Sequence, residues 1–229
     1  MLDFVNFGEA GPVKDLNLIL MSRRRLLWLI IILIVLALYF PVNRLAHGGV
    51  QLSLPIDKLI PLYPPAVVPY LLADILFIVF PIWAALRVKP GEFEAYAVSI
   101  LMATLLSYFV YLIFPTFVTR PAITSKDLFS KVLLIIYQTD RAYNAAPSGH
   151  TFYSVLSFLY INRWKPKYKP IWIFATLLIL ASALLTKQHY VLDIVCGLAL
   201  GILAFAVGRF SQTKWDLKFA SQSSTKIPD

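Results

Sequence analysis

Charge is what this sequence has least of. Lys, Arg, Asp and Glu together make up 14% of its 229 residues, whereas a typical soluble domain carries roughly 25%. The apolar set AVILMFWYC reaches 59%, so an ordinary water-soluble protein, a disordered chain, a coiled coil and collagen are all excluded. The net charge of +9 raises a first question for a chain this apolar, namely which side of a membrane carries the positive charge.

Cysteine and metal-ligand patterns are also scarce. Cys196 is the single cysteine, which excludes an intrachain disulfide and favours a small apolar core residue. No zinc-ligand spacing occurs, and the acids Asp57, Asp127 and Asp140 are too scattered for a two-metal site. We therefore expect no metal and no cofactor.

Long apolar runs dominate what is present. The first run follows three arginines and resembles a signal-peptide core, but no A-x-A cleavage site follows it, so we expect a retained helix. The sequence predicts one all-α membrane domain over residues 1–229, a bundle of six transmembrane helices between an N-terminal cytoplasmic segment, 1–22, and a polar tail, 211–229. The six runs are residues 26–40, 66–86, 93–114, 148–161, 171–185 and 190–210.

The distribution of Lys and Arg predicts the orientation. With both termini in the cytoplasm, most of the 21 Lys and Arg fall on the inner side, as the positive-inside rule requires. The connection 162–170 is the strongest indication, because it holds four cations and no acid. Positive charge on this side serves topology and contact with anionic lipid, so nucleic-acid binding is not expected.

The outer side then holds the longest polar stretches, residues 41–65 and 115–147, and all three histidines, His47, His150 and His189. Several cations lie there against the orientation rule. We therefore expect the functional site on the extracytoplasmic face.

Pro147, Ser148, Gly149 and His150 precede an apolar run and predict a helix start. The backbone N–H groups of such a start form an anion site at the positive end of the helix dipole, and glycine lets a phosphate approach the backbone. A plain helix cap beside an interfacial histidine is the alternative interpretation.

His189 and Asp193 are four residues apart, so they share one face of a predicted helix. The carboxylate is expected to accept the Nδ1 proton of the imidazole and leave Nε2 as a nucleophile or base. The alternative for Asp193 is a helix-start carboxylate favoured by the dipole.

Arg120 and Lys187 lie on the same predicted surface and provide cations for a phosphate group. Taken alone, each of them is explained as a residue at the membrane interface whose charged end reaches water. Together with the two histidines and the helix start, they describe a phosphoryl pocket. Asp140, Arg141 and Asn144 come just before this helix start, and we interpret them as turn-building residues.

Three motifs in this order resemble the type 2 phosphatidic acid phosphatase superfamily, which includes vanadium haloperoxidases. They are Arg120-Pro121, Pro147 to His150, and His189 with Asp193. Two positions depart from the family pattern, since Ile113 replaces its Lys and Ala183 replaces an Arg. Lys187, Lys126 or Arg141 are the candidates to compensate. Thr186 to Tyr190 and Ile113 to Thr116 are similar to the inositol phosphorylceramide synthase-like branch.

The resemblance implies a metal-independent reaction through a phosphohistidine. In it, His189, oriented by Asp193, is the nucleophile and His150 the general acid, while Arg120, Lys187, Ser148 and Gly149 bind the phosphate oxygens. The implied substrate is a phospholipid or a polyprenyl phosphate or diphosphate, and membrane lipids are the expected partners. A head-group phosphotransferase is the main alternative. A small transporter that uses His189 and Asp193 as a proton or ion relay is a third hypothesis, which six spans and an intramembrane Asp74 permit. It is disfavoured because the histidines and cations gather at one surface.

Overall fold

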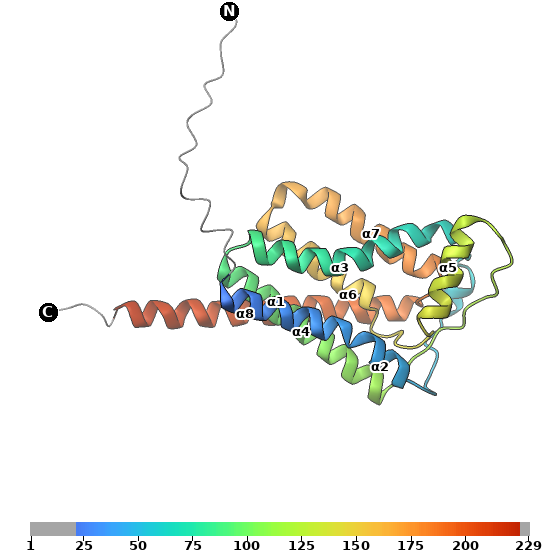
Figure 1. The fold of residues 1–229 in the computed structure, drawn as a ribbon, viewed down its shortest axis with the longest axis horizontal. Coiled ribbons are helices and arrows are strands. Elements are labelled where there is room, and N and C mark those ends of the chain that lie inside the picture. The colour runs from blue at the N-terminus through green and yellow to red at the C-terminus, as the bar shows by residue number, and fades with distance from the viewer. Residues whose placement is uncertain (1–21, 225–229) are drawn as a thin grey trace, which may run out of the picture.

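The computed structural model describes residues 22–224, with side chains up to Thr213, and most of these residues are helical (Figure 1). This confirms the predicted all-α fold class. All but the last residue of the predicted segment 1–22, and the last part of the predicted tail, lie outside the described residues, but residues 211–224 continue the last helix. The helices are α1 (Arg23–Ala37), α2 (Tyr39–Leu45), α3 (Val67–Arg87), α4 (Pro90–Ile113), α5 (Leu128–Thr139), α6 (Gly149–Trp164), α7 (Lys169–Leu185) and α8 (Val191–Ser224), with 3-10 turns η2 (Pro55–Lys58), η3 (Pro64–Ala66) and η4 (Pro166–Tyr168).

Five helical stretches within the described part of the chain are long and apolar enough to cross a membrane. The sixth predicted span, α6, has 16 residues, or about 24 Å of helix, which is short of the hydrocarbon thickness of roughly 30 Å. Most of its side chains are buried by neighbouring helices. The count of six spans therefore stays a prediction. The five stretches are Arg23–Leu45, Pro64–Arg87, Pro90–Ile113, Pro166–Leu185 and Val191–Thr213.

Helix α6 lies at the centre of the bundle, where it packs against α8, α7, α4 and α3. Glycines on α8 allow the close approach, because a Cβ at Gly201 would come within 3.1 Å of Val155 on α6. Gly197 lies one turn earlier, which gives the small-residue spacing that favours helix packing in membranes. The resulting core is apolar and aromatic, with Phe152, Tyr160 and Leu156 fully or almost fully buried.

Charged side chains form hydrogen bonds and ion pairs between helices at the end of the bundle where α1 begins. Arg25 is buried and donates to the carbonyls of Ala85 and Val88 at the end of α3. Arg24 forms an ion pair with Glu94 at 2.8 Å. Glu92 accepts hydrogen bonds from four side chains of α6 and α8, namely Arg163, Trp164, Arg209 and Gln212.

The opposite end carries α5 and the long connections (Figure 1). Residues 41–65 and 115–147 were expected to be polar connections, but the first contains part of α2 and two 3-10 turns, and the second contains α5. An isolated bridge from Val50 to Thr116 joins these two connections, and a second bridge, from Phe117 to Tyr143, lies within the latter. The expected functional residues lie at this end.

Candidate active site

The site begins at the first turn of α6. Ser148 caps the helix, since its Oγ accepts from the Thr151 N–H at 3.4 Å, and its own N–H donates to the Asp193 carbonyl at 3.0 Å. This second bond fixes the start of α6 against the start of α8. A Cβ at Gly149 would meet nothing closer than Tyr153 at 4.0 Å. Because the first turn of a helix has no intrahelical acceptor for its N–H groups, this open side suits an anion.

His150 is held by α3. Its ring stacks on Tyr70, with ring centroids 4.0 Å apart, and Phe77 packs against it edge-on at 5.3 Å. Its Nε2 lies 3.1 Å from Oδ1 of Asp74, although the two groups are not aligned as a hydrogen bond. Tyr70, Asp74 and Phe77 are spaced by four and three residues, so one face of α3 provides all three contacts. Asp74, the intramembrane acid that permits the transporter hypothesis, therefore borders the predicted site.

His189 is buried just before α8, and its ring centroid is 6.0 Å from that of His150. Its Nδ1 lies 2.9 Å from the carbonyl oxygen of Ala145. A carbonyl can only accept, so Nδ1 carries the proton and Nε2 keeps a free lone pair. This is the tautomer that a nucleophilic histidine needs.

Asp193 lies beside His189, as the spacing predicts, but it is not the closest acceptor. Its Oδ2 is 3.7 Å from Nδ1 and instead accepts the Tyr190 N–H at 2.7 Å. The carboxylate thus accepts a backbone hydrogen bond at the start of α8. The acceptor for His189 Nδ1, which was expected to be Asp193, is the carbonyl oxygen of Ala145. Asp193 is fully buried, and its Oδ1 has no hydrogen-bond partner among the described residues.

Arg120 brings a cation to the site from the segment after α4. Its guanidinium donates to the carbonyls of Asp140, at 2.6 Å, and Tyr137, at 3.3 Å, and to Oε1 of Gln188. It also lies over the Tyr137 ring, 4.7 Å from the centroid. Gln188 directly precedes His189, so Arg120 is fixed next to the histidine pair.

Lys187 is placed differently from the expectation. Its ammonium donates to the carbonyls of Asp57, at 3.1 Å, and Ile60, which ties the turn before α8 to η2. Asp57 completes this connection, because its carboxylate accepts the Val191 N–H at 2.9 Å. Lys187 therefore stabilises the connection around the site. Arg141, another candidate to compensate for the missing cations, donates to the carbonyls of α2 and is likewise engaged.

Several buried donors around the histidines lack a partner within the described part of the chain. They belong to Arg120 (Nε), Asn144 (Nδ2), His150 (Nε2) and Gln188 (Nε2). Buried donors without acceptors are costly in a folded protein, and such groups mark places where a ligand supplies the acceptor. Gln188 was within a predicted motif but had no role assigned to it, and Asn144 was interpreted as a turn residue. No sequence signal separates these amides from ordinary loop residues.

Asp140 borders the same group of side chains. Burial raises the pKa of its carboxyl, while the hydrogen bond from Tyr39 and the charges of Arg120, His150 and His189 oppose that shift. Asp140 was also interpreted as a turn residue. The structure adds two roles, since its carbonyl holds Arg120 and its carboxyl joins α2 to the site.

The residues whose side chains are described contain no group of three or more His, Cys, Asp or Glu placed to hold a metal ion. The cationic side chains at this end include Arg120, Lys187 and Arg141, and the first turn of α6 adds backbone N–H groups without intrahelical acceptors. Fold and site together define a multi-pass helical membrane protein, and one end of its bundle contains a cluster of buried hydrogen-bond donors that have no partner among the described residues.

A comparison with protein families identifies the class more closely. The model of the PAP2 superfamily matches residues 57–207, which is more than half of the chain and includes all three motifs. The chain therefore belongs to the PAP2 superfamily, whose activities are generally those of phosphatases and phosphotransferases. No curated protein and no solved structure matches it.

Proposed function

We propose that this protein is a lipid phosphate phosphatase that hydrolyses a phospholipid or polyprenyl phosphate or diphosphate through a phosphohistidine on His189. The observation that carries the proposal is the bond from His189 Nδ1 to the Ala145 carbonyl. It leaves the Nε2 lone pair free in a region that also contains four buried donors without acceptors among the described residues. A phosphoryl group supplies those acceptors and gives Nε2 an electrophile.

The reaction proceeds in two displacements. The Nε2 lone pair of His189 attacks phosphorus, the bond from phosphorus to the ester oxygen breaks, and His150 donates a proton to the leaving alkoxide. Water then attacks phosphorus while His150 takes its proton, the phosphorus–nitrogen bond breaks, and inorganic phosphate leaves. Arg120, Gln188, the Ser148 cap and the backbone at Gly149 stabilise the oxygens. Membrane lipids surround the bundle, and the site faces the extracytoplasmic side.

The test is phosphate release from phosphatidic acid or a polyprenyl diphosphate by the purified protein in detergent with EDTA. His189→Gln and His150→Ala should each lower the rate by about 10²-fold or more, the range expected for losing a positioned acid or nucleophile. His47→Ala is the matched control, because His47 is exposed and bonds only to the nearby Leu45 carbonyl among its described contacts. Strict dependence on a divalent metal, or full activity in both site variants, would contradict the proposal.

A head-group phosphotransferase is the second candidate. The stretch from Thr186 to Tyr190, which resembles the inositol phosphorylceramide synthase-like branch, contains both His189 and the Gln188 that binds Arg120. The first displacement is the same, and an alcohol replaces water in the second. Supplying an alcohol acceptor and measuring phosphorylated alcohol against free phosphate separates the two functions.

A further inference from the structure

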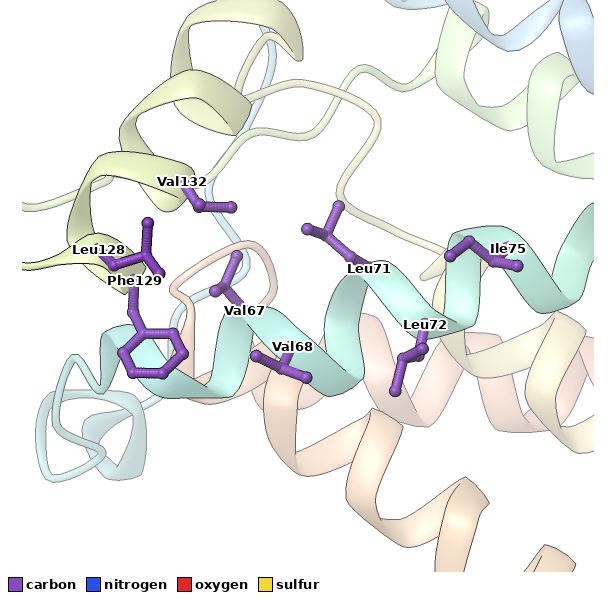
Figure 2. Close-up of a pocket in the computed structure, with 8 residues that line it drawn as sticks. All are labelled: Val67, Val68, Leu71, Leu72, Ile75, Leu128, Phe129 and Val132. Carbon is purple, nitrogen blue, oxygen red and sulfur yellow. The ribbon is translucent and has the colours of Figure 1, made fainter.

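An apolar groove of about 300 Å³ lies between α3 and α5. Figure 2 shows its lining side chains, with those of α5 lying across from Val67 and Leu71 of α3. All eight lining residues are aliphatic or aromatic. We call this hollow the α3–α5 groove.

Several lining side chains are largely uncovered by the protein. Leu72 is 53% exposed, Ile75 55% and Leu128 71%. Each Å² of apolar surface removed from water contributes about 25 cal/mol, so hydrocarbon is the favoured covering for this surface. A concave lining surrounds a chain on more than one side, which a flat helix face does not do.

The α3 wall of the groove borders the histidine that protonates the leaving group. Asp74, which approaches His150 Nε2, lies between Leu71 and Ile75 in the sequence of α3. At 1.5 Å per residue, Leu71 and Asp74 are about 4.5 Å apart along the helix axis. The face of α3 that holds His150 and the face that lines the groove therefore meet at Asp74, whose side chain is 48% exposed.

The α5 wall holds the cation of the site. Arg120 lies over the Tyr137 ring and donates to the Tyr137 carbonyl. Tyr137 belongs to the same helix as Leu128, Phe129 and Val132, which line the groove. The two helices that form the groove are thus the two that position His150 and Arg120.

We propose that the α3–α5 groove binds the hydrocarbon chain of the phosphate ester that His189 attacks. The proposal rests on the proposed function and specifies its substrate as an ester with a long apolar chain. The chain lies against the α3 residues from Val67 to Ile75, and the phosphoryl group lies on the other side of Asp74, among the unpartnered donors. Such a groove gives affinity for long chains and no contact to short ones.

The experiment compares two substrates that share a head group, dioleoyl and dibutyryl phosphatidic acid. Leu72→Trp and Val68→Trp fill the groove and should lower kcat/KM for the dioleoyl ester about tenfold, with the dibutyryl ester changed less than twofold. Leu105→Trp is the matched control, because Leu105 is 52% exposed on α4 and lies outside the groove. Equal loss on both esters, or no loss on either, would overturn the proposal.

Direct labelling separates failure of the groove from failure of the proposed function. A dioleoyl-length phosphatidic acid with a diazirine in its chain should label peptides from 67–75 and 128–132, and Leu72→Trp should reduce this labelling at least threefold. Labelling at these peptides by a protein that releases no phosphate would keep the groove and reject the phosphatase. Labelling at the hollow between α3 and α7, lined by Pro69 and Leu178, would instead reject the groove.

Discussion

Gly149 has open space around it and lies at the start of α6, where we expect a phosphate to bind. A Cβ there meets no protein atom closer than 4.0 Å, so Gly149→Ala should fold normally. Its melting temperature should stay within about 2 °C of that of the unchanged protein, because the added methyl group causes no steric clash. The methyl group would stand where phosphate oxygens approach the backbone. We expect KM for phosphatidic acid to rise several-fold in steady-state kinetics. An unchanged KM would place the phosphate away from this turn.

We expect Asp74 to be a positioning residue for His150. Its carboxylate lies 3.1 Å from Nε2 without the alignment of a hydrogen bond, and Tyr70 stacks on the imidazole that is proposed to act as general acid. Asp74→Asn removes the charge and keeps the shape, so kcat should fall about tenfold, a part of the 10²- to 10⁴-fold that a positioned acid contributes. The residual rate of His150→Ala should be unaffected by Asp74→Asn. Equal losses in both backgrounds would show that Asp74 acts elsewhere.

The sequence was sufficient to predict that His150, His189, Asp193 and Arg120 lie close together. The order of the motifs places them at one end of the bundle, and the helix period places His189 and Asp193 on one face. The partner of His189 could not be predicted in this way. The acceptor that fixes its ring is the carbonyl of Ala145, a backbone atom that any residue provides. For Lys187, the sequence shows a cation near the site, but the carbonyls of Asp57 and Ile60 that bind it come from a distant turn.

At the scale of elements, α8 makes close contacts at both ends of the bundle. A Cβ at Gly197 would lie 2.6 Å from the Ser148 carbonyl, and one at Gly208 would overlap Ser99 and Tyr160. Gly197→Ala and Gly208→Ala should each destabilise the protein by about 1 to 3 kcal/mol through overpacking. Only Gly197→Ala should also change kinetics, because it displaces the capped start of α6. Melting temperature and KM, measured on the folded fraction, distinguish the two variants, and a KM change in Gly208→Ala would refute this division.

The apolar runs predict the main helices closely, since α3, α4 and α7 begin and end within a few residues of the expected spans. Helix α5 was missed because its continuous apolar run, residues 132–137, is far shorter than a membrane span and lies within a connection that was interpreted as polar. In the fold, α5 packs against α3, and the carbonyl of Tyr137 near its end accepts a hydrogen bond from Arg120. Composition alone also does not show that α6 is short and buried, because this depends on the helices packed around it.

The whole molecule carries charged side chains at both ends of its bundle. The beginning of α1 and the far part of α8 lie at one end, and α5 lies at the other (Figure 1). The connection between α6 and α7 contributes Lys165, Lys167 and Lys169 to the first of these ends, close to the Arg163 that pairs with Glu92. By the positive-inside rule we expect that end to face the cytoplasm and the site to face outward.

A single cysteine makes this orientation directly measurable. Cys196→Ser gives a cysteine-free protein, in which Lys126→Cys and Lys167→Cys each place one exposed thiol at opposite ends of the bundle. In intact cells, a membrane-impermeant maleimide should label Lys126→Cys and should label Lys167→Cys only after permeabilisation, because the charged reagent does not cross the bilayer. The reverse pattern would place the site in the cytoplasm. Substrate would then have to come from the inner leaflet, so the same measurement determines which lipid pool can reach His189.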